Sequence, residues 1–144
     1  MKTLKEITAL LPHQPPFRFV DNVTEYIPTK ELCATFKPID CKSTFGDSDE
    51  VPFTILGEGL AQAAVIFTQM ESEPLTESDV PMLGNMEASY FGRVLWEDKI
   101  TYKIKPYRIL GRQAILYGKL FGSNGELVLS AKLSVAVRNS PSKN

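Results

Sequence analysis

One carboxylate in an otherwise apolar helix is the group best placed to do chemistry in this sequence. Between Phe53 and Phe67 the only polar side chains are Thr54, Glu58 and Gln62. Because they are four residues apart, they form one stripe on a helix that is apolar elsewhere. An unpaired carboxylate in apolar surroundings is costly, so Glu58 needs a partner, a solvated cleft or a chemical task. The plainer alternative is that the stripe faces water.

The composition indicates a single globular domain. The chain has 144 residues, of which 43% are hydrophobic and 23% charged, which is enough for one real core. We expect one domain over residues 1–138 and a disordered tail over 139–144. The 16 basic and 17 acidic residues give a net charge of −1, which provides no electrostatic case for binding nucleic acid or an anionic membrane.

The N-terminal stretch and the cysteines indicate a cytoplasmic protein. Residues 1–16 lack the long apolar core and the cleavage site of a signal peptide, and no apolar run is long enough to span a membrane. Cys33 and Cys41 are therefore expected to be reduced thiols. Neither lies at zinc-ligand spacing, and His13 is the only histidine, so we expect no metal site and no cofactor.

Periodicity and turn residues predict a short helix, two strands, a long helix and four more strands. A helix over 2–11 is ended by a proline, and an irregular loop over 40–50 leads to the long helix, which Ser48 or Asp49 could cap. The expected strands cover residues 17–26, 31–37, 80–91, 98–107, 112–121 and 126–137. Between the last two, Ser123-Asn124-Gly125 is a hairpin signal.

This order of elements predicts an α+β fold with an antiparallel sheet. A helix that is apolar on nearly every side needs cover on nearly every side, which strands curling around it supply and one flat sheet does not. The pattern therefore favours the hotdog fold, a sheet wrapped around one helix, over a sandwich with the helix on one face. Because a sheet edge needs cover, we also expect two chains to pair along an edge strand.

Three segments of the sequence carry a resemblance to one known family. They are LPHQPPFRFVDNV at 11–23, EGLAQ at 58–62 and MLGNMEASYFGRVLWEDKI at 82–100. In that order they resemble the L-P-H-R-x-P-F-L-L-V-D-x-V, E-x-x-A-Q and G-I-x-x-A-x-F-x-x-P-V-x-P-G-D segments of the β-hydroxyacyl-acyl-carrier-protein dehydratases. The similarity covers nearly the whole chain with matching spacing, and it favours the same hotdog fold.

The resemblance implies a substrate and a pair of catalytic residues. The substrate would be an acyl thioester carried on acyl carrier protein, or alternatively on coenzyme A, bound at the interface of a hotdog dimer. In the family, a loop His acts as base on the carbon next to the thioester carbonyl, and a helix Glu of the other protomer helps the β-hydroxyl leave as water. Glu58 stands at the position of that Glu, and Gln62 completes the helix motif.

The chain departs from this family at the position of the base. Counting back from the helix without a gap aligns Ser43–Asp47 with the family's G-H-F-P-G, so that Thr44 replaces the His. A threonine hydroxyl is no base near neutral pH unless another group activates it, and losing a positioned general base costs ~10²–10⁴ in rate. Asp49 and Glu50 also bring negative charge to the helix start, where enolate-like charge would develop.

The candidate site joins these residues with others of the same segments. The catalytic candidates are Glu58, Gln62 and Thr44. The candidate substrate-binding residues are Phe45, Gly46, Asp47, Thr54, Tyr90 and Arg93. Lys103 and Lys105 share one strand face, which could meet an acidic carrier protein or simply be solvated.

Three functions stay open at this point. The first is a dehydratase-like enzyme, a hydro-lyase with weakened or altered catalysis, in fatty acid, lipid or polyene biosynthesis. The second is an inactive hotdog subunit that binds acyl thioesters, as a homodimer or as a heteromer in which it completes a partner subunit's site. The third is an acyl thioesterase, although EGLAQ together with the LPH opening favours the dehydratase side.

Overall fold

A computed structural model of the chain describes residues 17–46, 48–71, 79–110 and 113–139. In chain order its elements are β1 Asn22–Ile27, β2 Glu31–Phe36, the 3₁₀ helix η1 Pro38–Cys41, α2 Lys42–Phe45, α3 Phe53–Glu71, β3 Asp79–Tyr90, β4 Ile100–Leu110, β5 Gln113–Phe121 and β6 Leu127–Asn139. The helix expected over 2–11 lies outside the described residues. Asn139 ends β6, and the rest of the expected tail also lies outside them.

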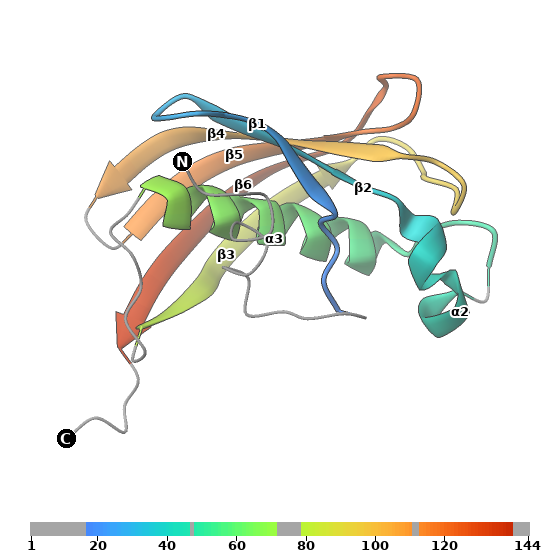
Figure 1. Ribbon diagram of the computed structural model, residues 1–144, viewed down its shortest axis with the longest axis horizontal. Coiled ribbons are helices and arrows are strands. Elements are labelled where there is room, and N and C mark those ends of the chain that lie inside the picture. Colours follow the sequence, from blue (N-terminus) through green and yellow to red (C-terminus); the bar gives the residue numbers. More distant parts are fainter. Residues whose placement is uncertain (1–16, 47, 72–78, 111–112, 140–144) are drawn as a thin grey trace.

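The strands form one antiparallel sheet in the order β1-β2-β4-β5-β6-β3. Figure 1 shows this sheet curving over α3, with α2 beyond the end at which α3 begins. The prediction of an α+β hotdog fold is therefore confirmed. Within the described part of the chain, β1 and β3 are the two edges of the sheet.

The central helix lies close to the sheet because glycines remove side chains from the contact. Leu56, Leu60 and Phe67 of α3 are fully buried, as their apolar surroundings in the sequence predict. A Cβ at Gly59 would lie 2.0 Å from the hydroxyl of Tyr102 on β4. A larger residue at position 59 would therefore force Tyr102 or α3 to move.

Alternation along each strand gives the sheet an inner face against α3 and an outer face. On β4, Tyr102 and Ile104 are fully buried, whereas Lys103 lies between them and Lys105 follows, both on the outer face. The same alternation runs along β5 and along β6 from Leu129 onward, although Val128, just before it, is buried as well. The turn between β5 and β6 contains Gly125 at φ +80°, so the predicted hairpin is confirmed.

Two details of the sequence prediction are wrong around the long helix. Residues 40–45, predicted to be irregular, are helical, because Pro38 starts the 3₁₀ helix η1 and α2 follows directly. The backbone N–H groups of Ile55 and Leu56 donate to the carbonyl of Pro52, so Ser48 and Asp49 lie too far upstream to cap α3. The Ser48 hydroxyl donates to the carbonyl of Glu50 instead.

The first strand also begins later than predicted, at Asn22 instead of Phe17. The backbone of Phe17 and Phe19 is hydrogen-bonded by side chains of the core, as described below, whereas the Asp21 N–H already donates to the Thr35 carbonyl on β2. Within the described residues, no helix has the combination of length and hydropathy that a membrane span requires.

Candidate functional site

Hydrogen bonds join the segment that leads into α3 to the segment that follows β3. The Val51 N–H donates to the Val94 carbonyl at 2.8 Å, and the indole Nε1 of Trp96 donates to the Ser48 carbonyl at 2.8 Å. Trp96 is fully buried, so packing holds its indole ring in place and with it the hydrogen bond to Ser48. Two segments that are distant in the sequence therefore build the end of the molecule at which α3 begins.

Gly46, a predicted substrate-binding residue, follows the last residue of α2 and packs against Trp96. A Cβ at position 46 would lie 2.8 Å from Cζ2 of Trp96, so no larger residue fits without movement. The Gly46 N–H donates to the Lys42 carbonyl at 2.8 Å and closes the helical turn. Gly46 thus has a packing role, while Asp47, the next predicted residue, lies outside the described residues.

Phe45 and Thr44 are neighbours on α2 with different surroundings. The ring of Phe45 packs edge to face on Phe17 and Phe19, with centroids 5.9 Å apart in each pair. Thr44, which the sequence analysis aligns with the family's base, is exposed. The only histidine of the sequence, His13, lies outside the described residues. Phe45 therefore holds α2 to the core, and α2 presents a threonine hydroxyl to solvent.

A cavity of about 260 Å³ opens beside the first turn of α3. Its lining consists of Ser48, Glu50, Val51, Pro52, Phe53 and Arg93. A second cavity of about 310 Å³ shares Glu50 and Arg93 with the first. In the wall common to both, Nη1 of Arg93 lies 3.3 Å from Oε1 of Glu50, and both side chains are partly exposed. The charge of Glu50 at the helix start is thus offset by Arg93, in a surface pair of small net energy.

An aromatic pair lies at the edge of this cavity. The rings of Phe53 and Tyr90 are 4.6 Å apart between centroids, and the Tyr90 hydroxyl donates to the Phe53 carbonyl at 3.2 Å. Burial raises the pKa of Tyr90, so its hydroxyl stays a neutral donor. Thr54 is the next residue of α3 and is exposed. Phe53 is 53% exposed and was not among the predicted site residues. Its position directly after Pro52, at the start of the helix, could have indicated it.

The two ends of the helix motif have different surroundings. Gln62 is only 1% exposed; its Oε1 accepts the Phe19 N–H and its Nε2 donates to the Phe17 carbonyl, both at 2.7 Å. Gln62 therefore holds the backbone that precedes β1 against α3. Glu58, one turn earlier, is partly exposed and lies one turn beyond Thr54. Among the candidate catalytic residues, Glu58 is the one on the solvent-accessible part of the stripe.

Neither cysteine has the environment of a nucleophile. Burial raises the pKa of the Cys41 thiol, and the carboxylates of Asp21 and Asp40 raise it further. Burial and Glu31 raise the pKa of the Cys33 thiol in the same direction. Both thiols are therefore protonated near neutral pH and react slowly.

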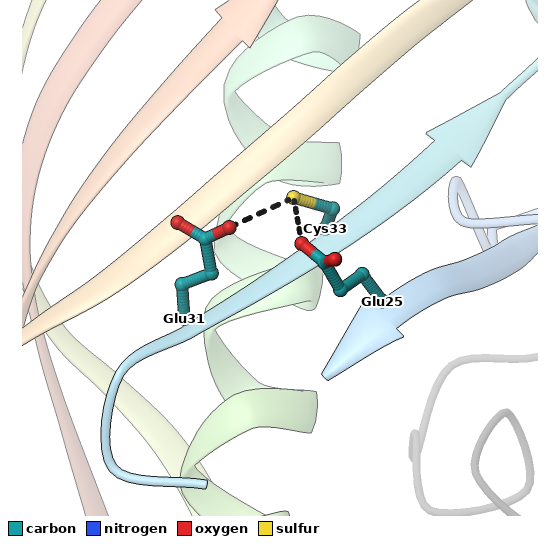
Figure 2. A group of neighbouring side chains, drawn as sticks. All are labelled: Glu25, Glu31 and Cys33. Carbon is teal, nitrogen blue, oxygen red and sulfur yellow. Dashed lines mark hydrogen bonds between the residues drawn. The ribbon is translucent and has the colours of Figure 1, made fainter. Parts of the chain in front are cut away.

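Cys33 belongs to the one group of described side chains whose ligand atoms are close enough to share a metal ion. Figure 2 shows the carboxylates of Glu25 and Glu31 turned toward its Sγ, at 4.0 and 3.8 Å. The three ligand atoms lie within 4.8 Å of one another. Lys105 Nζ also lies 3.9 Å from Glu31. The Lys105 amine lies beside Glu31 and the single thiol proton can be donated to Glu25, so the group is consistent without an ion.

Comparison with known proteins identifies relatives over the full chain, although no sequence model of a protein family matches it. The 3-hydroxyacyl-[acyl-carrier-protein] dehydratase FabZ of Histophilus somni strain 2336 is 31% identical over 140 residues, which cover 93% of this chain and 91% of the relative. The thioesterase HI1161 of Haemophilus influenzae has a TM-score of 0.70 at 16% identity, covering 100% of this chain and 96% of that one. A hypothetical thioesterase of Streptococcus pneumoniae, solved with coenzyme A, has a TM-score of 0.65 at 13% identity over 82% of this chain and 86% of that one.

Proposed function

Because the chain belongs to the family of 3-hydroxyacyl-[acyl-carrier-protein] dehydratases called FabZ, we propose that it binds acyl thioesters but, alone, dehydrates 3-hydroxyacyl thioesters slowly or not at all. The observation that carries this proposal is that α3 has the partly exposed carboxylate Glu58, whereas α2 has the exposed Thr44, which we align with the family's base. The carrier is acyl carrier protein, as in the names of the relatives, with coenzyme A as the alternative.

The end of the molecule where α3 begins has the features of a thioester-binding region. The two adjoining cavities, of about 260 and 310 Å³, are each near the ~300 Å³ at which small-molecule pockets start. The Phe53 and Tyr90 rings offer apolar contact to an acyl or pantetheine chain. The guanidinium of Arg93 could bind a phosphate if it left its weak surface ion pair with Glu50.

The chemistry explains why the threonine matters. Dehydration removes a proton from the carbon next to the thioester carbonyl and expels the β-hydroxyl as water, which forms the carbon–carbon double bond. Glu58 supplies a carboxyl group to assist the leaving hydroxyl, but the first step needs a base that can hold the α-proton near neutral pH. Thr44 cannot do this, so elimination should be limited at proton removal.

A mixed dimer would restore the missing group. In the resembling family each site combines the loop of one protomer with the helix of the other, so a chain with Glu58 and no loop His can complete one site of a His-bearing hotdog subunit. The edge strand β3 and the residues after it expose Met82, Leu83, Phe91 and Leu95, which is the kind of surface that a partner covers. Such a pair has one active site instead of two.

The test is an assay of the purified chain with a 3-hydroxybutyryl thioester of acyl carrier protein, following the crotonyl product. We expect activity near background, and a gain of about 10²-fold or more in Thr44→His, because a positioned base is restored. Thr44→Gln is the matched control, similar in size and without a base. Glu58→Gln in the Thr44→His background should remove the gain. Strong activity of the unmodified chain would contradict the proposal and point to another base.

The same preparation separates the other two functions. Release of free thiol from the thioester, measured with a thiol reagent, would assign the chain to the thioesterases instead. Co-expression with a His-bearing hotdog subunit should give a heteromer whose activity is lost in Glu58→Gln. Recovery of homodimers alone would leave acyl binding without a completed site.

A further inference from the structure

The turn between β5 and β6 presents an asparagine followed by a glycine to solvent. Asn124 and Gly125 are both exposed, and Figure 1 shows this turn projecting beyond the sheet. The Gly122 N–H donates to the Glu126 carbonyl at 2.9 Å, and the Gly125 N–H donates to the Gly122 carbonyl at 3.0 Å. Two backbone hydrogen bonds therefore close the turn around Asn124.

The side chain of Asn124 takes no part in holding this turn. Asparagine in a turn often hydrogen-bonds the backbone through its own side chain. Here the side-chain amide has no hydrogen bond in the described part of the chain, whereas the backbone N–H donates to Oε1 of Glu126 at 3.0 Å. The neighbouring Ser123 differs, since its hydroxyl accepts the Lys99 N–H at 2.9 Å. The amide of Asn124 is therefore free to turn toward the backbone.

The residue after Asn124 leaves that approach open. The backbone nitrogen that follows an asparagine is placed to attack the side-chain carbon Cγ, because the two atoms close a five-membered ring. A side chain on the following residue would crowd this ring, but Gly125 has none, and a Cβ there would meet nothing within 4 Å. Its φ of +80° is also one that glycine adopts without steric cost. The pair thus combines an unbonded amide with an unhindered nucleophile.

We propose that Asn124 is a site of spontaneous deamidation, with water as the only co-reactant. The Gly125 nitrogen forms a bond to Cγ of Asn124 while the Cγ–Nδ2 bond breaks, and Nδ2 leaves as ammonia with the Gly125 amide proton. Water then opens the cyclic imide. Opening at Cγ leaves aspartate, and opening at the backbone carbonyl leaves isoaspartate, in which the backbone runs through Cβ and Cγ. This modification does not rest on the proposed function.

The folded turn slows this reaction without preventing it. The Gly125 nitrogen must first release its hydrogen bond to Gly122, and an exposed bond of this kind is worth up to about tenfold in rate. The Asn124 amide is unbonded among the described residues, so no second hydrogen bond has to be released. We therefore expect the folded chain to react at most about tenfold more slowly than an unfolded peptide of the same sequence.

The products change the contacts of the turn. Isoaspartate adds one backbone carbon, so the Gly122 N–H and the Glu126 carbonyl no longer lie opposite each other. Both products also add a negative charge beside Glu126. The Ser123 hydroxyl donates to Asp98, whose other carboxylate oxygen accepts the Leu95 N–H at 2.9 Å. A displaced turn therefore alters the segment that follows β3.

The experiment incubates the purified full chain at neutral pH and follows each asparagine by peptide mapping with mass spectrometry. A carboxyl methyltransferase specific for isoaspartate labels that product. We expect Asn124 to convert at least about tenfold faster than Asn22 and Asn85, which are also exposed but lie in strands and precede Val23 and Met86. Asn124→Gln is the matched variant, since glutamine keeps an amide but would need a six-membered ring. A synthetic peptide of residues 121–127 gives the unfolded rate.

Several results would overturn the proposal. They are conversion of Asn124 no faster than that of Asn22 or Asn85, unchanged ammonia release in Asn124→Gln, absence of a methyl-accepting product, or a folded chain more than about tenfold slower than the peptide. In the converted fraction, the Gly122 amide should lose its protection from hydrogen exchange. Unchanged protection would contradict the expected effect on the turn.

Discussion

The inner face of the sheet is closely packed, whereas the outer face places like charges opposite each other. On the inner face, the Tyr102 hydroxyl donates to the Phe19 carbonyl at 2.8 Å, in a space that exists only because residue 59 is glycine. On the outer face, Lys103 stands directly opposite Lys119. The inner face therefore leaves no room for substitution, whereas the outer face has charges that folding alone would not select. This difference separates the residues that determine the fold from those available for binding.

The largest expected effect is on the inner face, in Gly59→Ala. The added methyl group would overlap the buried Tyr102 hydroxyl, which must move and give up its bond to Phe19. We expect a loss of about 3 kcal/mol of unfolding free energy, measured by urea denaturation, from overpacking and an unsatisfied carbonyl. Gly92→Ala is the matched control, since a Cβ there meets nothing within 4 Å. Equal stability of the two variants would contradict the close contact of α3 with β4.

The second prediction compares the two residues of the helix motif. Gln62→Ala removes both bonds to the backbone of Phe17 and Phe19 and leaves buried polar groups without partners, so it should cost about 2 kcal/mol or more. Glu58→Gln keeps the shape of a partly exposed side chain and should change stability by less than about 0.5 kcal/mol. The measurement is again urea denaturation. A larger loss of stability in Glu58→Gln than in Gln62→Ala would show that Glu58, and not Gln62, has the structural role.

The third prediction concerns alkaline pH. Burial raises the pKa of Tyr102 well above the ordinary 10.0, and burial together with Glu71 raises that of Tyr26. Both phenols are neutral in the folded and unfolded chain below pH 10.0. Above it only the unfolded chain ionises, so the stability present below that pH is lost as pH rises toward the folded pKa values, by about 1.4 kcal/mol per pH unit for the buried Tyr102 and by less for the partly exposed Tyr26.

Urea denaturation between pH 9 and pH 11, together with phenolate absorbance, checks this slope. Tyr102→Phe should be less stable at neutral pH, by about 1 kcal/mol for the lost hydrogen bond, but should show a shallower decline at alkaline pH. A native protein in which Tyr102 ionises without unfolding would contradict the burial of its hydroxyl.

The smallest predicted effect is on the outer face and has the opposite sign. Lys119→Gln removes the like charge opposite Lys103 and should raise stability by about 0.2–1 kcal/mol, a small increase in melting temperature. The increase should shrink at high salt, because exposed charges are screened. Loss of stability in Lys119→Gln would show that this lysine stabilises the fold. It would contradict the claim that the two faces differ in this respect.

Much of the fold could be predicted from local patterns. The apolar run with one polar stripe gave α3, and the alternating segments gave the strands, because both periodicities follow from backbone geometry alone. The short helical turns at Pro38 and Lys42 were missed because their residues have no period to detect. The site residues stay a prediction. Tyr90 contacts Phe53 at the first turn of α3 and Arg93 pairs with Glu50 just before it, whereas Gln62, Phe45 and Gly46 have packing roles that no local pattern indicated.

By itself the sequence predicted that α3 is apolar on most of its sides and that the strands alternate, and its resemblance to the family predicts that Thr44 aligns with the family's base. Tertiary structure alone decided the partners of the polar groups. Gln62 bonds residues 45 and 43 positions away, and Trp96 bonds a carbonyl 48 positions away, which no local pattern specifies. Lys119 and Lys132 join Lys103 only through the register of β4, β5 and β6. Periodicity is a property of neighbouring residues, whereas register and close approach depend on the path of the whole chain.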